Sequence, residues 1–194
     1  MGDYAAYIAA VIVIAVVYFL WDTYVNGEVE YVKSTVDGNE YQVRSLPDKI
    51  EAANLLAKIR KNLETLSQHL EKTKQDDPRT VMIVRNFKPE KVSEGNESSK
   101  YTSYSVNKGE KIVFCLRSKD AGKKLVDLNT LMFVALHELA HVATESVGHT
   151  AEFWDNFKWI LNEAINIGVY KKQDFKKNPQ PYCGMTITDS PLEH

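Results

Sequence analysis

The most apolar stretch of the chain lies near its N-terminus. The 18 residues from Tyr4 to Trp21 include no charged side chain, and as a helix they would span roughly 27 Å, close to the hydrocarbon core of a bilayer. Tyr7 and Tyr18 lie near the two ends, as in an aromatic belt. A cleaved signal peptide fits poorly, because no basic residue precedes the run. The pattern predicts a single-pass membrane anchor over residues 1–25, with a buried core helix as the alternative.

Alternating apolar and polar residues after this run predict two β-hairpins. The first joins residues 31–36 to residues 41–44 across an Asp-Gly turn signal. The second joins residues 101–107 to residues 111–117 across a Lys-Gly pair. A short apolar run, VMIV at residues 81–84, predicts a buried strand.

Helical periodicity marks three further segments. Apolar residues recur three and four positions apart from Leu56 to Leu70, which predicts an amphipathic helix that packs on a core. Residues 88–100 are polar and predict a loop. Residues 129–145 and 150–167 predict two more helices.

These elements predict an α+β fold. We expect a globular domain over residues 26–175, after the anchor, and a C-terminal tail over residues 176–194. The tail contains prolines and a glycine and predicts an ordered loop at most.

Composition narrows the classes of function. The chain has 194 residues and a formal net charge of −2, from 24 basic and 26 acidic residues. This balance of charges does not predict a nucleic acid as the main partner, because it provides no excess of basic residues. The two cysteines, Cys115 and Cys183, are too few for a disulfide scaffold or an all-cysteine zinc site. A single disulfide between them is compatible with the sequence.

The strongest chemical signal is an HExxH motif, His137-Glu138-Leu139-Ala140-His141. Histidines four apart lie on one face of a helix, so both imidazoles can reach one metal ion. Glu138 is displaced around the helix, where it can take a proton from a water molecule that the metal activates. The apolar residues 131–136 lead directly into the motif, as expected for a buried active-site helix.

A catalytic zinc ion needs a third protein ligand and one open position. Glu145 is too distant, because eight residues separate it from His137, about 12 Å along an unbroken helix. The third ligand must come from chain that has turned back. Gly148 supplies a turn, and we predict that His149 is the third ligand.

A thermolysin-like arrangement is the competing interpretation of the third ligand. It uses a carboxylate from a later helix, and Glu152, Asp155 or Glu163 would serve. The metzincin pattern does not apply, because position 147 is Val.

Three segments together resemble the WLM and SprT-like group of small zinc metallopeptidases. They are residues 112–117 (IVFCLR), the HELAH motif, and residues 148–154 (GHTAEFW). The resemblance covers roughly residues 80–170. The second and third segments are specific in combination, whereas the match over the first is weak.

This resemblance implies a compact zincin domain, with a small twisted sheet over the active-site helix. Its edge strand would pair with an extended peptide substrate. It assigns one zinc ion to His137, His141 and His149, and the role of general base to Glu138. Relatives often act on proteins that are crosslinked to DNA, and they bind the DNA through basic extensions. This chain shows no such extension, so a role in DNA repair is not implied. Similar anchored zincins occur among hypothetical proteins of large DNA viruses.

Three other residues are weaker candidates. Tyr170 and Tyr182 are candidates to donate a hydrogen bond to the developing oxyanion, with a structural role as the alternative. Cys183 offers a thiolate that would close the open metal position as a latency ligand. Ordinary tail packing, or a bridge to Cys115, is the alternative.

The leading hypothesis from the sequence is a membrane-anchored zinc endopeptidase that acts on a protein or peptide. A second hypothesis is a catalytically silent zincin-fold module that binds a partner while tethered to a membrane. A third is a structural zinc site with a fourth ligand such as Cys183, in which Glu138 would have no purpose.

Overall fold

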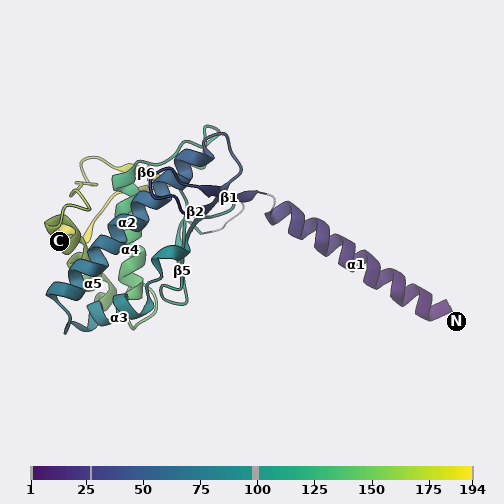
Figure 1. The fold of residues 1–194 in the computed structure, drawn as a ribbon, viewed down its shortest axis with the longest axis horizontal. Helices are drawn as coiled ribbons and strands as arrows, with labels where there is room; N and C mark the ends of the chain where they lie inside the picture. Colours follow the sequence, from purple (N-terminus) through teal and green to yellow (C-terminus); the bar gives the residue numbers. More distant parts are fainter. Residues whose placement is uncertain (1, 27, 98–100, 194) are drawn as a thin grey trace.

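The computed structural model describes residues 2–26, 28–97 and 101–193 of the chain. The helices are α1 (Gly2–Asn26), α2 (Lys49–Thr73), α3 (Pro78–Asn86), α4 (Leu128–Val142) and α5 (Ala151–Asn166), with the 3-10 turns η1 (Pro89–Lys91) and η2 (Pro191–Glu193). The strands are β1 (Val29–Lys33), β2 (Glu40–Arg44), β3 (Val92–Glu94), β4 (Tyr104–Val106), β5 (Lys111–Phe114), β6 (Gln180–Tyr182) and β7 (Met185–Ile187). The predicted mixed α+β fold with small sheets is confirmed (Figure 1).

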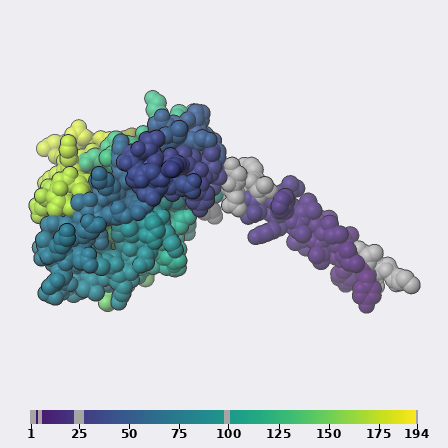
Figure 2. Space-filling model, in the orientation of Figure 1, coloured from purple at the N-terminus to yellow at the C-terminus, as the bar shows by residue number. Residues whose placement is uncertain are grey.

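Helix α1 extends away from the rest of the molecule as a separate arm (Figure 1, Figure 2). Its large apolar side chains, such as Val11 and Ile14, are exposed. Within the described parts of the chain, no helix is both long enough and apolar enough to cross a membrane. The predicted membrane anchor over residues 1–25, and the membrane localisation inferred from it, are therefore wrong. The prediction rested on the absence of charged side chains from Tyr4 to Trp21 and on the aromatic residues near the ends of that run.

Strands β1 and β2 form the first predicted hairpin and pair antiparallel from Val29 with Arg44 to Lys33 with Glu40. The turn between them contains Gly38 at a φ of 74°. Helix α2 follows the hairpin and presents the predicted apolar stripe to the core. Every member of that stripe is fully buried: Leu56, Ile59, Leu63, Leu66 and Leu70. The first hairpin and this helix are both confirmed.

The central sheet has the strand order β3-β5-β4. Strands β4 and β5 pair antiparallel and confirm the second predicted hairpin. Strand β3 pairs parallel with β5, although its sequence lies inside the predicted loop 88–100. That prediction rested on the polar composition of the segment and on Pro89, Gly95 and Asn96. It was wrong for β3, because the structure buries all three residues of this strand. Residues 98–100 of the predicted loop lie outside the described residues.

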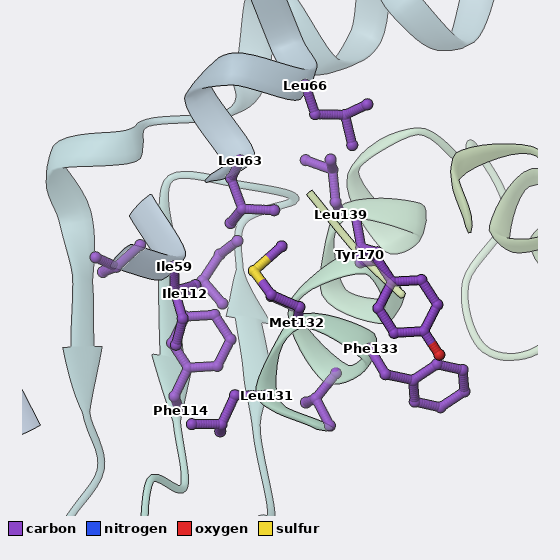
Figure 3. Close-up of a cluster of buried hydrophobic side chains, with 14 of the residues drawn as sticks. Ile59, Leu63, Leu66, Ile112, Phe114, Leu131, Met132, Phe133, Leu139 and Tyr170 are labelled. Carbon is purple, nitrogen blue, oxygen red and sulfur yellow. The ribbon is translucent and has the colours of Figure 1, made fainter. Parts of the chain in front are cut away.

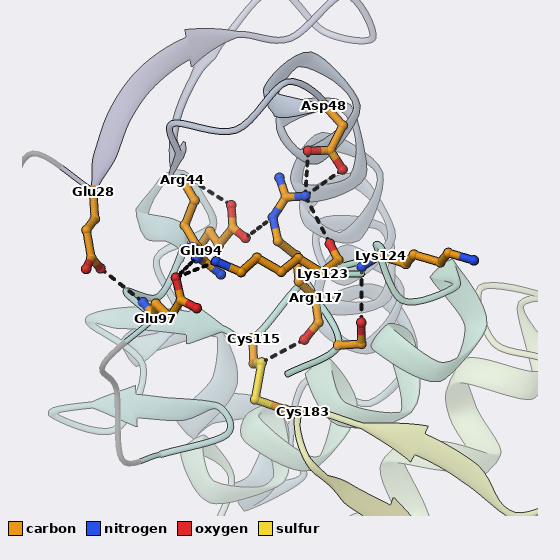
Figure 4. A network of polar contacts seen from close by, with 11 residues as sticks. Glu28, Arg44, Asp48, Glu94, Glu97, Cys115, Arg117, Lys123, Lys124 and Cys183 are labelled. Carbon is orange, nitrogen blue, oxygen red and sulfur yellow. Dashed lines mark hydrogen bonds and ion pairs between the residues drawn. A yellow bond between two sulfur atoms is a disulfide. The ribbon is translucent and has the colours of Figure 1, made fainter. Parts of the chain in front are cut away.

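Burial of Glu94 is compensated by a network of polar contacts (Figure 4). Nε of Arg117 donates to one carboxylate oxygen of Glu94 at 2.8 Å, and the backbone N–H of Arg44 donates to the other at 2.8 Å. Nη1 of Arg117 also donates to the carboxylate of Asp48, at the start of α2. Desolvation raises the pKa of Glu94, and the contacts with Arg44 and Arg117 oppose that shift. The network joins β3 to α2 and to the chain that follows β5.

The predicted strand at residues 81–84 is instead part of helix α3. Asp77 caps this helix by accepting a hydrogen bond from the backbone N–H of Arg79 at 2.9 Å, and Pro78 occupies its first turn. Thr80 and Ile83 are buried and Val84 is exposed, so burial follows a helical period. The prediction was wrong because a short apolar run does not distinguish a strand from a helix.

Helices α4 and α5 lie against each other and complete the core with α2 (Figure 3). Leu139 of α4 faces Leu66 of α2, and Phe133 lies beside Tyr170 (Figure 3). Both predicted helices are confirmed, each with ends shifted by a few residues.

The tail beyond residue 176 is more ordered than the sequence predicts. Strands β6 and β7 pair antiparallel, with Cys183 and Gly184 at the turn. A disulfide joins Cys183 to Cys115, just after β5 (Figure 4). This bond attaches the hairpin to the central sheet.

Candidate metal centre

Helix α4 places His137 and His141 by local geometry. Its first turn is capped by the carboxylate of Asp127, which accepts hydrogen bonds from two backbone N–H groups at 2.9 and 3.0 Å. Most of the helix is buried, whereas the two histidines are partly exposed on one face. Their ring centroids are 4.9 Å apart, as expected for residues one helical turn apart.

The third histidine comes from chain that turns back after α4. The helix ends at Val142, and Gly148 lies in the following loop at a φ of 87°, a left-handed conformation that favours glycine. His149 is next, and Nε2 of His149 lies 3.1 Å from Nε2 of His137. The potential ligand atoms of His137, His141 and His149 all lie within 4.8 Å of one another.

This group of nitrogens fits a zinc ion. Two ligands on a tetrahedral zinc ion, with Zn–N bonds of about 2.0–2.1 Å, are about 3.3 Å apart. The separation of 3.1 Å between the His137 and His149 nitrogens is close to that value. Within the described residues, these three histidines form a group able to hold a metal ion, as the HExxH spacing and Gly148 predicted.

The structure places the competing carboxylates elsewhere. The Glu152 carboxylate accepts a hydrogen bond from the Ser146 hydroxyl at 2.6 Å, and Glu163 forms an ion pair with Lys74 at 3.3 Å. Asp155 lines a second cavity, which His137 also lines. None of the three candidate acids belongs to the group of metal-ligating side chains found in the described chain.

Burial sets the protonation of the two helical histidines. Desolvation, followed by the charges of His141 and His149, lowers the pKa of His137 to about 3. Desolvation, followed by the charges of His149 and Lys108, lowers the pKa of His141 to about 4. Both imidazoles are therefore neutral near pH 7, the form that binds a metal ion.

Glu138 lies next to this group and is only 4% exposed. Desolvation raises the pKa of its carboxyl to about 7, and a hydrogen bond from the backbone N–H of Ser105 opposes the shift. Glu138, His137, His141 and His149 all line one cavity of about 770 Å³. The other walls include residues 102–105, 107 and 108 at β4, Phe133 and Val134 in the middle of α4, and residues 185–189 at β7.

The two predicted oxyanion donors lie in different surroundings. Tyr182 lines the cavity with Glu138, and its hydroxyl lies 2.5 Å from the Ser103 hydroxyl. Burial raises the pKa of Tyr182. Tyr170 is buried against Phe133, with ring centroids 6.2 Å apart, and is not among the described residues that line the cavity.

The disulfide decides between the two interpretations of Cys183. Its sulfur is bonded to Cys115, so Cys183 does not present a thiolate to the metal site. The latency-ligand prediction does not hold in this structure, and the alternative bridge does.

Two site residues were not found from the sequence. Lys108 was seen only as a turn residue, yet its ammonium contacts the loop that carries His149. Asn156 lies on α5, and its Nδ2 donates to the carbonyl of Ala143 and to the hydroxyl of Thr144, each at 3.0 Å. A lone lysine in a turn and a lone asparagine in a helix give no signal of such contacts.

With the fold and the histidine group described, the comparisons with known proteins are informative. A family model described as the WLM domain matches residues 37–193. The chain belongs to the WLM family. The match includes the HExxH helix, the His149 loop and the C-terminal hairpin of this WLM protein.

Viral proteins are similar to this WLM protein over nearly its whole length. An uncharacterized protein of Acanthamoeba polyphaga mimivirus is 35% identical over 190 residues, which cover 96% of each chain. An uncharacterized protein of Invertebrate iridescent virus 6 is 27% identical over 183 residues, or 92% of this chain and 97% of the relative. The expected similarity to viral proteins is confirmed. No solved structure matches the chain.

Proposed function

We propose that this WLM protein is a zinc-dependent endopeptidase. The observation that carries the proposal is the joint placement of three histidine nitrogens and a buried glutamate in one open cavity. A structural zinc site would have four protein ligands and no need for the glutamate. The described group supplies three ligands, which is the number in catalytic zinc sites.

His137, His141 and His149 would hold the ion. When bound by three protein ligands, zinc supplies a Lewis acid that polarises a carbonyl group and lowers the pKa of a water molecule. The neutral state of His137 and His141 agrees with this role as ligands.

Glu138 moves the proton in the proposed reaction. Its carboxylate accepts a proton from water, and the water oxygen bonds to the carbonyl carbon of the peptide. The C–N bond then breaks, and Glu138 passes the same proton to the leaving nitrogen, so that one water is consumed per bond cleaved. Tyr182, which lines the same cavity, would donate a hydrogen bond to the developing oxyanion.

The proposed substrate is a protein or peptide in extended conformation. Strand β4 is an outer strand of the order β3-β5-β4 found among the described residues, and residues 102–105 at this strand line the cavity. A peptide that added to this edge would pair through its backbone and run past the histidines.

Replacing Glu138 by Gln tests the proposal, because the amide has nearly the shape of the carboxylate but is no base. We expect Glu138→Gln to retain zinc, measured by elemental mass spectrometry, and to lose about 10²–10⁴-fold in turnover of dye-labelled casein. Glu145→Gln is the matched control, since Glu145 is exposed beyond the end of α4. Equal turnover in both variants would show that Glu138 is not the base, and a zinc-loaded parent chain with no turnover would favour the catalytically silent binding module.

A further inference from the structure

The side chain of Lys108 reaches from the central sheet to the loop after α4. Lys108 lies in the turn between β4 and β5 at a φ of 52°. Its Nζ donates to the backbone carbonyls of Thr144 at 2.6 Å and Glu145 at 2.5 Å, and lies 3.5 Å from that of Ser146. One ammonium group thus contacts three successive carbonyls, equal to its number of N–H donors.

These contacts stabilise a particular path of the chain. Residues 144–146 lie just beyond Val142, the last residue of α4, near the negative end of the helix dipole, where a cation is favourable. Three successive carbonyls can face one ammonium only if the backbone curls around it. Lys108 therefore stabilises a curled conformation of residues 144–146.

The turn that carries Lys108 is itself closely packed on α4. A Cβ added at Gly109 would lie 3.0 Å from the Val142 side chain and 3.0 Å from the carbonyl oxygen of Asn86. Gly109 also has a φ of 112°, which L side chains rarely adopt. The base of the lysine is thus placed firmly against the last turn of the helix.

A side chain of α5 binds the backbone N–H groups of the same loop. The Glu152 carboxylate accepts hydrogen bonds from the backbone N–H groups of Glu145 at 3.2 Å and Ser146 at 3.3 Å. Lys108 binds the carbonyls of this segment and Glu152 binds its amides. Gly148 and His149 follow after one residue, Val147, so the position of the third histidine depends on how this segment is held.

We propose that Lys108 is a positioning residue for His149. It fixes the loop from which His149 reaches His137 and His141. The proposal rests on the metal site of the proposed function, but not on peptide hydrolysis.

A simple charge effect would act in the opposite direction. The positive charge of Lys108 lowers the pKa of His141, so by charge alone it would also oppose a metal cation. Removing the charge would then strengthen zinc binding. Loss of positioning would weaken it, so the direction of the change separates the two roles.

The test compares zinc affinities of full-length variants, measured by competition with a chelating indicator at pH 7.4. Lys108→Met removes the donors and keeps the aliphatic chain, Lys108→Arg keeps charge and donors, and Lys61→Met removes an exposed charge on α2 as the control. We expect Lys108→Met to bind zinc about 10-fold more weakly than the parent, the scale known for groups that orient metal ligands. Lys108→Arg should recover most of this loss, and Lys61→Met should match the parent.

The same substitution in a His149→Ala background tests whether Lys108 acts through His149. There Lys108→Met should cause no further weakening. Unchanged or stronger zinc binding in Lys108→Met, or an equal loss in the His149→Ala background, would overturn the proposal. Lower thermal stability with unchanged zinc affinity would show a structural role alone and would overturn it too.

Hydrogen exchange of the metal-free protein supplies a second readout that does not depend on zinc binding. We expect the amides of residues 145–149 to exchange faster in Lys108→Met than in Lys61→Met. Equal exchange rates would overturn the proposal even if the proposed site bound no zinc. Zinc binding by the parent chain tests the proposed site separately.

Discussion

The two halves of the histidine group are positioned by different means. His137 and His141 lie one turn apart on α4, and their separation follows from the helix itself. His149 lies on an irregular loop. The loop is contacted by residues of other elements, namely Lys108, 36 residues before Thr144, and Asn156 on α5. Local geometry therefore sets the positions of two candidate ligands, and tertiary contacts set the position of the third.

This difference predicts which substitutions affect the metal site. A substitution that destabilises the domain but leaves the helix intact should not change the spacing of His137 and His141. A substitution at a contact of the loop should weaken metal binding even where its effect on stability is smaller. Stability and zinc affinity should thus respond to different residues.

The largest expected effect on stability comes from Leu139→Ala. Leu139 is fully buried and lies on the opposite face of α4 from the two histidines. The cavity left behind should lower the free energy of unfolding by about 3 kcal/mol, measured by urea denaturation of the metal-free protein. Zinc affinity, measured where the variant is fully folded, should match that of the parent. A loss equal to that expected for Lys108→Met would break the comparison.

The sequence predicted the site as far as local geometry determines it. The HExxH spacing predicted His137, Glu138 and His141, and the adjacent glycine predicted that His149 follows a turn. Lys108 could not be predicted, because nothing in a Lys-Gly turn indicates which distant carbonyls an ammonium will reach.

The same reason explains the errors in the fold. The two hairpins and the long helices have strong local patterns and are confirmed. Strand β3 was missed because its buried Glu94 is acceptable only beside Arg117, a contact between residues far apart in sequence. The sequence did not decide whether Cys115 and Cys183 form a disulfide for the same reason, because they too are far apart in sequence. Helix α3 was missed because its apolar run is too short to show a period.

Asn156→Ala should have an intermediate effect on stability and should also weaken zinc binding. Asn156 is 7% exposed, and its loss would leave the buried carbonyl of Ala143 without this donor. We expect the free energy of unfolding to fall by about 2 kcal/mol and zinc affinity to fall with it. Asn162→Ala, at an exposed position on the same helix, is the matched control. Unchanged zinc affinity in Asn156→Ala would show that α5 does not help to place His149.

The smallest effect is expected at the cap of α3, which lies outside the histidine group. Asp77→Ala removes the hydrogen bond to the N–H of Arg79 and should lower the free energy of unfolding by about 1 kcal/mol at pH 7. The Arg79 side chain, and secondarily its backbone N–H, hold the pKa of Asp77 below its ordinary value of 3.8, against desolvation. The folded state therefore favours the ionised carboxylate, which stabilises the protein above that pH and stops doing so as the pH falls through the lowered value.

The difference in stability between the parent and Asp77→Ala, measured by urea denaturation, should thus be constant near neutral pH and narrow below about pH 4. Zinc affinity at pH 7.4 should be the same in both proteins, because none of the three histidines lies on α3 and the Asp77 carboxylate bonds to Arg79 within its own helix. If Asp77→Ala weakened zinc binding as Lys108→Met is expected to, metal affinity would follow global stability. The loop contacts would then have no special role, and the contrast between the helical histidines and His149 would fail.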